Sequence, residues 1–207
     1  MVQNQYFEDN QNLESRPHIH NFEIAGESFS FTTDIGVFSK SGVDEGTQVL
    51  LNYALNQDLK GDILDLGCGY GVVGIVLKRF YDKCQVTCCD VNNRALELTK
   101  LNQANNDCSL NTVYSDGFEN IAQTFDAIVT NPPIRVGKKV LYPLLEQAYK
   151  HLNKDGLFLA VVRRNQGAES MMKYLDSLYG NCEVVSKKKG YWVLKCIRNY
   201  IEINDKK

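Results

Sequence analysis

The pattern of apolar and polar positions divides the chain into alternating strands and helices. Five short apolar runs are typical of buried strands: 62–66, 85–89, 111–114, 125–130 and 156–162. Five segments before or between them carry apolar residues at helical spacing: 44–56, 71–80, 93–105, 138–152 and 167–178. Two more strands are predicted at 182–186 and 191–198, around a turn at 187–190. Near the start of the chain, 22–33 alternates in character around Gly26 and predicts a hairpin.

This order of elements predicts an α/β fold. Strands that alternate with helices form a parallel sheet covered by helices on both faces. The last two strands are joined by only a few residues, whereas a parallel crossover needs a dozen or more, so they form an antiparallel hairpin. We therefore expect a Rossmann-like, mostly parallel sheet with a reversed last strand and a short N-terminal hairpin. An N-terminal extension with the hairpin (1–40) would precede the main domain (41–200) and a C-terminal tail (201–207).

A glycine-rich loop joins the strand at 62–66 to the following helix. Its sequence, Asp-Leu-Gly-Cys-Gly-Tyr-Gly at 65–71, allows a tight turn and the close approach of a ligand to the backbone. Asp90 ends the next strand, 23 residues after Gly67. A carboxylate at that place can accept both ribose hydroxyls of a nucleoside. Dinucleotide-binding proteins use the same plan, so the loop alone does not identify the cofactor.

Two further features favour S-adenosylmethionine over a nicotinamide dinucleotide. Asp65 would repel a pyrophosphate but suits the cationic end of an amino acid. After the third strand, Asp116 can accept from an adenine amino group, and Phe118 can cover the adenine ring. The candidate cofactor-binding residues are Asp65, Gly67, Cys68, Gly69, Gly71, Asp90, Val91, Asp116, Gly117, Phe118 and Asn131.

An Asn-Pro-Pro-Ile tetrad at 131–134 follows the fourth strand. The exocyclic amine of a base is a poor nucleophile, because its lone pair is delocalised into the ring. Two acceptors on its two hydrogens, the Asn131 side-chain carbonyl and the Pro132 backbone carbonyl, would expose that lone pair. Positioning of this kind supplies much of the rate acceleration, and no strong base is required. An Asn-Pro that merely ends a strand is the alternative interpretation.

From about 29 to 198 the chain resembles the class I S-adenosylmethionine-dependent methyltransferases. Within that class it is similar to the small-domain group, which includes bacterial small-subunit (16S) ribosomal RNA guanine-N2 methyltransferases. The matching residues are Gly36-Val37-Phe38-Ser39, Asp44-Glu45-Gly46, Asp65-Leu66-Gly67-Cys68-Gly69-Tyr70-Gly71, Asp90, Asp116-Gly117-Phe118 and Asn131-Pro132-Pro133-Ile134.

The resemblance implies a seven-stranded sheet with a reversed final strand, and a methyltransferase domain at 41–200. It also implies S-adenosylmethionine as cofactor, and methyl transfer to guanine N2 of ribosomal RNA, free or in the small ribosomal subunit. Asn131, Pro132, Pro133 and Ile134 would form the catalytic set. Adenine N6 and the amide of a protein glutamine offer the same two hydrogens and fit the same tetrad. A methyltransferase-like binding module without catalysis, and a dinucleotide-dependent oxidoreductase, are the remaining alternatives.

The tetrad departs from the family pattern at its last position. Many amine methyltransferases have an aromatic residue there, which stacks on the flipped base, and this chain has Ile134. Phe38 is the candidate to replace that aromatic ring, and core packing is the other interpretation of Phe38.

The charge distribution indicates a nucleic-acid partner although the net charge is only −2. Three basic clusters follow strands at the edge where open α/β sheets bind ligands. They are Arg135, Lys138 and Lys139; Arg163 and Arg164; and Lys187, Lys188 and Lys189. Together they form a candidate phosphate-binding surface, with solvated loops as the alternative.

Nothing in the sequence predicts a metal site or a membrane segment. The seven cysteines include no Cys-x-x-Cys pair and several lie in apolar runs, which is typical of small buried residues in a reducing compartment. The apolar runs are too short to span a bilayer, and residues 1–20 carry no secretory signal. We therefore expect a cytoplasmic protein. Its oligomeric state is not predicted by the sequence.

Overall fold

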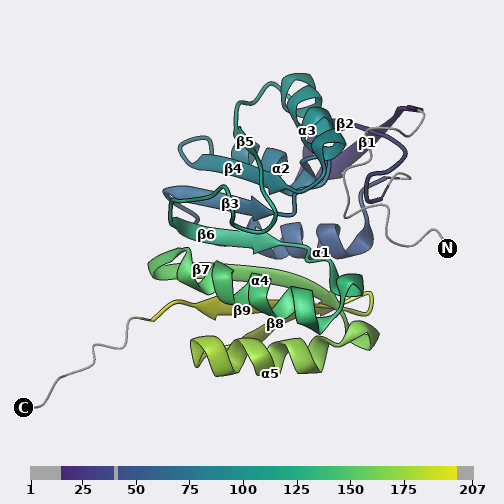
Figure 1. Cartoon of the computed structure of the whole chain (residues 1–207). Helices are drawn as coiled ribbons and strands as arrows, with labels where there is room; N and C mark the ends of the chain where they lie inside the picture. Colours follow the sequence, from purple (N-terminus) through teal and green to yellow (C-terminus); the bar gives the residue numbers. More distant parts are fainter. Residues whose placement is uncertain (1–14, 40–41, 200–207) are drawn as a thin grey trace, which may run out of the picture.

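A seven-stranded sheet runs through the centre of the protein (Figure 1). The computed structural model describes residues 15–39 and 42–199, so the tail predicted at 201–207 and the first part of the N-terminal extension lie outside it. In spatial order the strands are β5 (Asn111–Tyr114), β4 (Gln85–Asp90), β3 (Asp62–Leu66), β6 (Phe125–Thr130), β7 (Leu152–Arg163), β9 (Tyr191–Ile197) and β8 (Glu183–Lys188).

Strand direction follows the prediction. Neighbouring strands from β5 to β7 are parallel, and β9 is antiparallel to both of its neighbours, so the reversed final strand is confirmed. It lies between β7 and β8, not at the edge. The other strands all run the same way, and their carboxyl ends therefore meet at one edge of the sheet.

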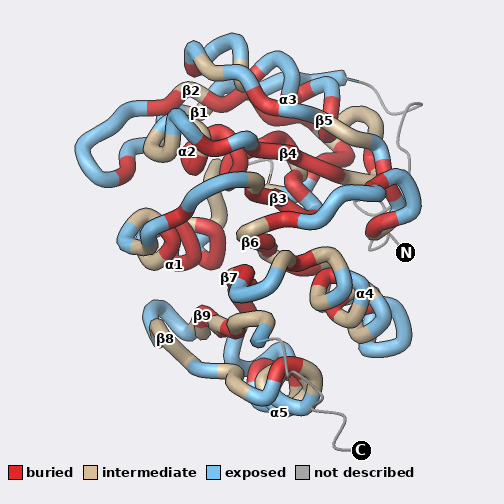
Figure 2. Tube along the Cα trace, turned by 90° about the vertical axis from the view of Figure 1, so that its left-hand side faces the viewer, coloured by how far each residue is buried: buried red, intermediate tan, exposed pale blue. Residues whose placement is uncertain are grey.

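Helices cover both faces of the sheet, as the alternating pattern predicted. On one face α1 (Glu45–Ala54), α2 (Val72–Phe80) and α3 (Asn93–Asn105) close a first hydrophobic core. On the other face α4 (Lys138–Lys150) and α5 (Ala168–Tyr179) close a second. Successive residues of β3 point to opposite faces of the sheet, so Ile63 packs in the first core and Leu64 in the second. Buried positions therefore run along the central strands (Figure 2).

Two strands of the central sheet extend beyond their predicted bounds. The strand expected at 156–162 begins at Leu152, because Phe125 of β6 pairs with Leu152 before the register shifts toward Ala127. Residues 153–155 are polar although they belong to β7, so the pattern of apolar residues does not predict this first part of the strand. The second strand is β8, which was expected to end at residue 186 but extends to Lys188, so only Lys189 and Gly190 form the turn before β9. Their φ values of 52° and 80° suit the mirror-image turn that two-residue hairpins prefer.

The hairpin predicted at 22–33 is formed by β1 (His18–Ile24) and β2 (Glu27–Thr33), so it begins four residues earlier than predicted. Phe29 and Phe31 of β2 stack with ring centroids 6.0 Å apart and belong to the first core. The side chain of Asn102 in α3 bonds both to the Thr32 amide, at 2.7 Å, and to the Thr32 carbonyl, at 2.8 Å. The hairpin is thus fixed against α3. No helix among residues 15–39 and 42–199 is long and apolar enough to cross a membrane.

Candidate functional site

The carboxyl edge of the sheet contains a topological switch point between β3 and β6. From β3 the chain proceeds outward to β4 and β5, whereas from β6 it proceeds to β7 on the other side. Ligands of open α/β sheets bind at such crevices. The Thr130 hydroxyl, at the end of β6, donates to the Leu66 carbonyl at 2.8 Å. This bond holds the glycine loop and the Asn-Pro-Pro-Ile tetrad next to each other.

The glycine loop leaves open space above its backbone. Gly67 and Gly69 have φ values of 73° and 55°, and a Cβ built on either would meet no atom within 4 Å. The Gly67 and Cys68 amides donate to the Cys89 carbonyl at 3.0 and 2.9 Å, which fixes the loop to β4. Gly71 serves packing instead, because a Cβ there would lie 2.8 Å from the Thr99 side chain. The loop is therefore a preformed cradle for a ligand.

Asp65 lies beneath this loop and is only 1% exposed. Its Oδ2 accepts from the Gly74 amide at 2.8 Å, in the first turn of α2. Helix α2 begins at a glycine with no side-chain cap of its own, so a carboxylate from β3 satisfies this free amide. Burial, with a smaller contribution from the charge of Asp90, raises the pKa of Asp65 to about 7, although the Gly74 bond opposes the rise.

Asp90 presents an oriented carboxylate at the end of β4. Its Oδ2 accepts from the Gly69 amide at 2.8 Å, and its Oδ1 accepts from the Asn92 amide at 2.9 Å. Burial raises its pKa, while these backbone bonds and one from Val91 oppose the rise. A carboxylate has about four acceptor positions, so beside these three backbone bonds at least one remains for a ligand hydroxyl.

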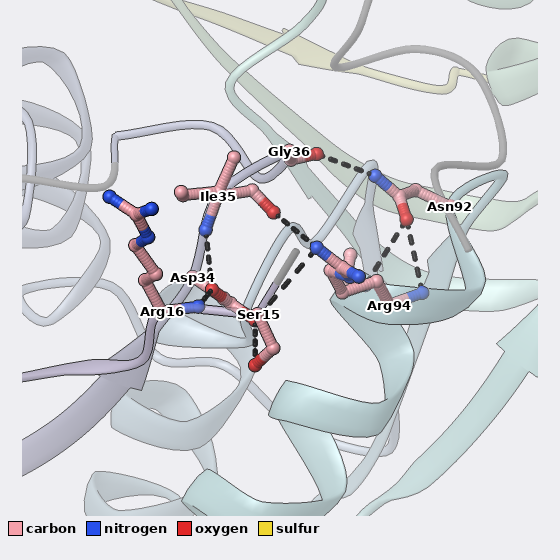
Figure 3. A network of polar contacts seen from close by, with 8 residues as sticks. Ser15, Arg16, Asp34, Ile35, Gly36, Asn92 and Arg94 are labelled. Atoms are coloured by element: carbon pink, nitrogen blue, oxygen red, sulfur yellow. Dashed lines mark hydrogen bonds and ion pairs between the residues drawn. The ribbon is translucent and has the colours of Figure 1, made fainter. Parts of the chain in front are cut away.

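A polar network joins Ser15 and Arg16, where the described residues begin, to the amino end of α3 (Figure 3). Asp34 accepts from the Arg16 amide at 2.6 Å and from the Ser15 hydroxyl at 2.8 Å, and the Arg94 guanidinium lies 3.9 Å away. Burial opposes ionisation of Asp34, but these hydrogen bonds outweigh it and hold its pKa below the ordinary value.

The segment after Asp34 runs along the candidate site. Asn92, two residues after Asp90, donates through Nδ2 to the Gly36 carbonyl at 2.9 Å (Figure 3). Val37 is buried in the first core, whereas Phe38 is 48% exposed. That exposure does not fit the core-packing interpretation of Phe38. Its ring is therefore free to contact a ligand.

The Asp116–Phe118 segment differs in part from its expected arrangement. Asp116 is exposed in the turn after β5. Phe118 is only 5% exposed and stacks on His151, with ring centroids 4.3 Å apart. So deeply packed a ring offers little surface to an adenine, and Phe118 mainly supports the turn that carries Asp116.

The tetrad forms a tight turn at the end of β6. The Ile134 amide donates to the Pro132 carbonyl at 2.8 Å around Pro133, whose φ of −74° and ψ of 75° make an inverse γ-turn. This bond fixes the direction of the Pro132 carbonyl and leaves its second lone pair available. Ile134 begins a short 3₁₀ helix, η1 (Ile134–Val136), and packs against the second core.

Two residues that sequence reasoning did not assign to the site hold the Asn131 side chain. Its Nδ2 donates to the Thr47 hydroxyl at 3.1 Å and lies 3.4 Å from each carboxylate oxygen of Asp44. Asp44 caps the amino end of α1, and Thr47 lies in the first turn of that helix. Asp44 stood within a motif of the family resemblance, but no pattern indicated that it meets Asn131.

The structure brings two of the basic clusters together. Arg163 and Lys188 both pair with Tyr191, so their side chains share the face of the sheet that α1 covers. Lys187 pairs with Trp192, and its ammonium lies 4.7 Å from the centroid of that ring. Lys187 and Lys188 are therefore the last residues of β8, and the expectation that all three lysines form one turn is wrong. Successive strand residues point to opposite faces, so the side chains of Lys187 and Lys188 lie on different faces of the sheet.

The other basic residues are also exposed. Arg164 begins a second short 3₁₀ helix, η2 (Arg164–Gln166), and Lys189 lies 3.3 Å from Glu45 of α1. Arg135 lies in η1, and Lys138 begins α4 with its ammonium 5.7 Å from the ring centroid of Tyr142.

The cysteines contribute packing to this region. Five of them are buried, and Cys108 and Cys182 are partly exposed. Burial raises the pKa of the Cys68 thiol well above its ordinary value. Within the described part of the chain, no group of three or more His, Cys, Asp or Glu side chains could hold a metal ion.

Comparison with known proteins gives a consistent picture. The family model "Methyltransferase small domain" matches residues 28–195. The uncharacterized protein YbxB of Bacillus subtilis is 39% identical over 193 residues, which cover 92% of this chain and 96% of YbxB. Ribosomal RNA small subunit methyltransferase C of Actinobacillus pleuropneumoniae is 38% identical over 165 residues, 76% of this chain and 48% of the relative.

A solved structure extends this comparison. The T. thermophilus 16S rRNA N2 G1207 methyltransferase (RsmC), in complex with AdoMet and guanosine, superposes with a TM-score of 0.81 at 25% identity. The match covers 90% of this chain and 52% of that protein. The chain therefore spans nearly all of YbxB but about half the length of the methyltransferase C relatives.

Proposed function

The chain belongs to the methyltransferase small domain family, and from this premise we propose that it transfers a methyl group from S-adenosylmethionine to an exocyclic amino group of an RNA base. Guanine N2 of small-subunit ribosomal RNA is the target that the named relatives favour. Such a substrate would make ribosomal RNA or the small ribosomal subunit the partner, and would place the reaction in the cytoplasm.

The residues around the glycine loop suit this cofactor. S-adenosylmethionine supplies an electrophilic methyl group on a sulfonium. The open backbone of Gly67 and Gly69 admits its amino-acid part, and Asp65 offers negative charge to the ammonium. Asp90, with both carboxylate oxygens oriented by backbone amides, would accept the ribose hydroxyls. Asp116 is exposed and can accept from the adenine amino group.

The single observation that carries the proposal is the position of Asn131 and Pro132 beside the glycine loop. The Thr130–Leu66 bond joins the two strand ends that hold these groups. The Asn131 amide nitrogen is engaged by Asp44 and Thr47, so the carbonyl oxygen of Asn131 is the atom left for an acceptor amine. With the Pro132 carbonyl it would hold both amine hydrogens and direct the nitrogen lone pair toward the methyl group.

Binding of the RNA would use the exposed groups at the same edge. Phe38 replaces the missing aromatic residue of the tetrad as the surface on which a flipped base stacks, since Ile134 packs against the second core. The exposed basic residues would contact phosphates. These are Arg135, Lys138, Arg163, Arg164, Lys187, Lys188 and Lys189.

The test is methyl transfer from labelled donor to naked ribosomal RNA, isolated small subunits and whole ribosomes in parallel, followed by mass spectrometry of nucleosides and proteins. The proposal expects N2-methylguanosine in RNA. Label in N6-methyladenosine or in a protein glutamine would keep the amine chemistry but change the substrate. Donor binding without transfer to any of these substrates would favour a binding module without catalysis.

A further inference from the structure

We propose that Asp44 is a positioning residue, which acts with Thr47 to orient the side-chain amide of Asn131 so that its carbonyl oxygen faces the substrate. The inference rests on the proposed function, because it explains how the proposed acceptor atom of Asn131 is selected. Asp44 and Thr47 come from the amino end of α1, whereas Asn131 follows the end of β6, 87 positions after Asp44 and 84 after Thr47.

Asp44 is rigidly placed because it caps α1. Its Oδ1 accepts from the Gly46 amide at 2.9 Å and from the Thr47 amide at 3.2 Å, the usual bonds of an N-cap aspartate. The capped turn is itself packed, since Gly46 and Thr47 are both buried. A Cβ at Gly46 would lie 2.9 Å from the Tyr191 ring, so the helix end sits closely against β9. The carboxylate therefore has one well-defined position.

The hydroxyl of Thr47 links the fixed Asp44 carboxylate to the Asn131 side chain. It donates its hydrogen to Asp44 Oδ2, so toward Asn131 the Thr47 oxygen can only accept. The Asn131 Nδ2 group meets this oxygen at 3.1 Å and the two carboxylate oxygens at 3.4 Å. An amide turned the other way would place its carbonyl oxygen against three acceptor oxygens. Only one of the two amide orientations is therefore favourable.

This selection matters because the two orientations of an asparagine amide have almost the same shape. Packing cannot distinguish them, and only the polarity of the neighbours can. The turned amide would present N–H groups to an amine whose own hydrogens need acceptors. The hydrogen bond from the substrate amine to Asn131 would be lost, and the nitrogen lone pair would no longer be held in line with the methyl group. Asp44 and Thr47 thus decide whether Asn131 accepts or donates at the site.

The critical variant is Asp44→Asn. It reverses the direction of hydrogen bonding along the relay, by which we mean the chain of bonds from Asp44 through the Thr47 hydroxyl to the Asn131 amide, and it keeps the cap of α1. Asparagine is as good an N-cap as aspartate, so its oxygen can keep the Gly46 and Thr47 amides. Its NH₂ group then faces the Thr47 oxygen, which frees the Thr47 hydrogen to donate to Asn131 and favours the turned amide. We expect the turnover number to fall about a hundredfold, as when one oriented hydrogen-bonding group is removed from an active site. The donor dissociation constant and the melting temperature should stay close to wild type.

Two comparisons separate positioning from a general loss of structure. Glu45→Gln removes a negative charge from the same helix end and should leave turnover at saturating RNA unchanged. In an Asn131→Ala background, Asp44→Asn should not lower the turnover number any further, because Asp44 acts on turnover only through Asn131. If Asp44→Asn lowers the melting temperature, Thr47→Val interrupts the relay instead, and Thr47→Ser should restore the turnover that Thr47→Val loses.

The outcomes distinguish this inference from the proposed function. Wild-type turnover in Asp44→Asn, together with an inactive Asn131→Ala, would overturn the positioning role and leave the proposed function intact. An additional loss from Asp44→Asn in the Asn131→Ala background, or equal turnover in Thr47→Val and Thr47→Ser, would also overturn it. Wild-type turnover in Asn131→Ala would instead refute the proposed function itself.

Discussion

Replacing Asp65 by asparagine should make the ligand-free protein more stable at neutral pH and weaken its binding of S-adenosylmethionine. The Asp65 side chain is 1% exposed and accepts from the Gly74 amide at 2.8 Å. Asparagine keeps an oxygen for that amide and carries no charge. The variant therefore removes the cost of a buried charge while it preserves the cap of α2.

The size of the effect follows from the pKa of Asp65, which burial raises from 3.8 to about 7. A raised carboxyl pKa means that folding favours the protonated form. The stabilisation is complete below about pH 4 and is lost as the pH rises toward 7. At about 1.4 kcal/mol per pKa unit, the full loss is on the order of 4 kcal/mol. The variant should also raise the donor dissociation constant roughly ten- to hundredfold, because it removes the charge that we propose attracts the donor ammonium, an interaction of about 1.5–3 kcal/mol.

The assay is urea unfolding of wild type and Asp65→Asn from pH 5 to pH 9, with donor binding measured by calorimetry. Asp82→Asn, which removes an exposed carboxylate, controls for the change in net charge. Wild-type stability should fall between pH 5 and pH 7, and the Asp65→Asn profile should be flatter. A variant less stable than wild type at pH 8, or a wild-type profile with no fall in this range, would refute the reasoning about burial.

Three other variants test separate parts of the site. Asp90→Ala should weaken donor binding roughly ten- to hundredfold, because the ribose hydroxyls lose their charged acceptor, and an unchanged dissociation constant would mean that the ribose lies elsewhere. Phe38→Ala should raise the Michaelis constant for RNA without changing donor affinity, and an unaltered constant would remove the stacking role. Lys188→Ala should reduce the salt dependence of RNA binding by about one unit of slope or slightly less, whereas Lys187→Ala, on the opposite face, should change it less. Equal slopes for the two lysine variants would contradict this division between the faces.

The order of strands and helices could be predicted because the central strands are short apolar runs, and helices such as α4 and α5 bury residues at helical spacing between them. The first part of β7 could not, because residues 153–155 are polar although they continue the strand. The extent of β8 was underestimated for the same reason, since Lys187 and Lys188 look like turn residues but pair with Trp192 and Tyr191.

The candidate site could be predicted where it is local in sequence. The glycine loop, Asp90 and the tetrad each follow a strand, and the shared direction of parallel strands brings them to one edge. Contacts between distant segments could not be predicted. Nothing near Asn131 in the chain indicates that Asp44 and Thr47 hold its amide. The burial of Phe118 against His151 likewise depends on tertiary packing.

The central claim is that Asn131 acts on the acceptor amine and not on the cofactor. The most direct measurement compares wild type and Asn131→Ala in two assays, donor binding by calorimetry and single-turnover methyl transfer to small ribosomal subunits with saturating donor. We predict a donor dissociation constant within a few-fold of wild type, and a transfer rate lower by roughly two orders of magnitude or more. A folded Asn131→Ala variant that binds the donor and transfers methyl at the wild-type rate would contradict the account.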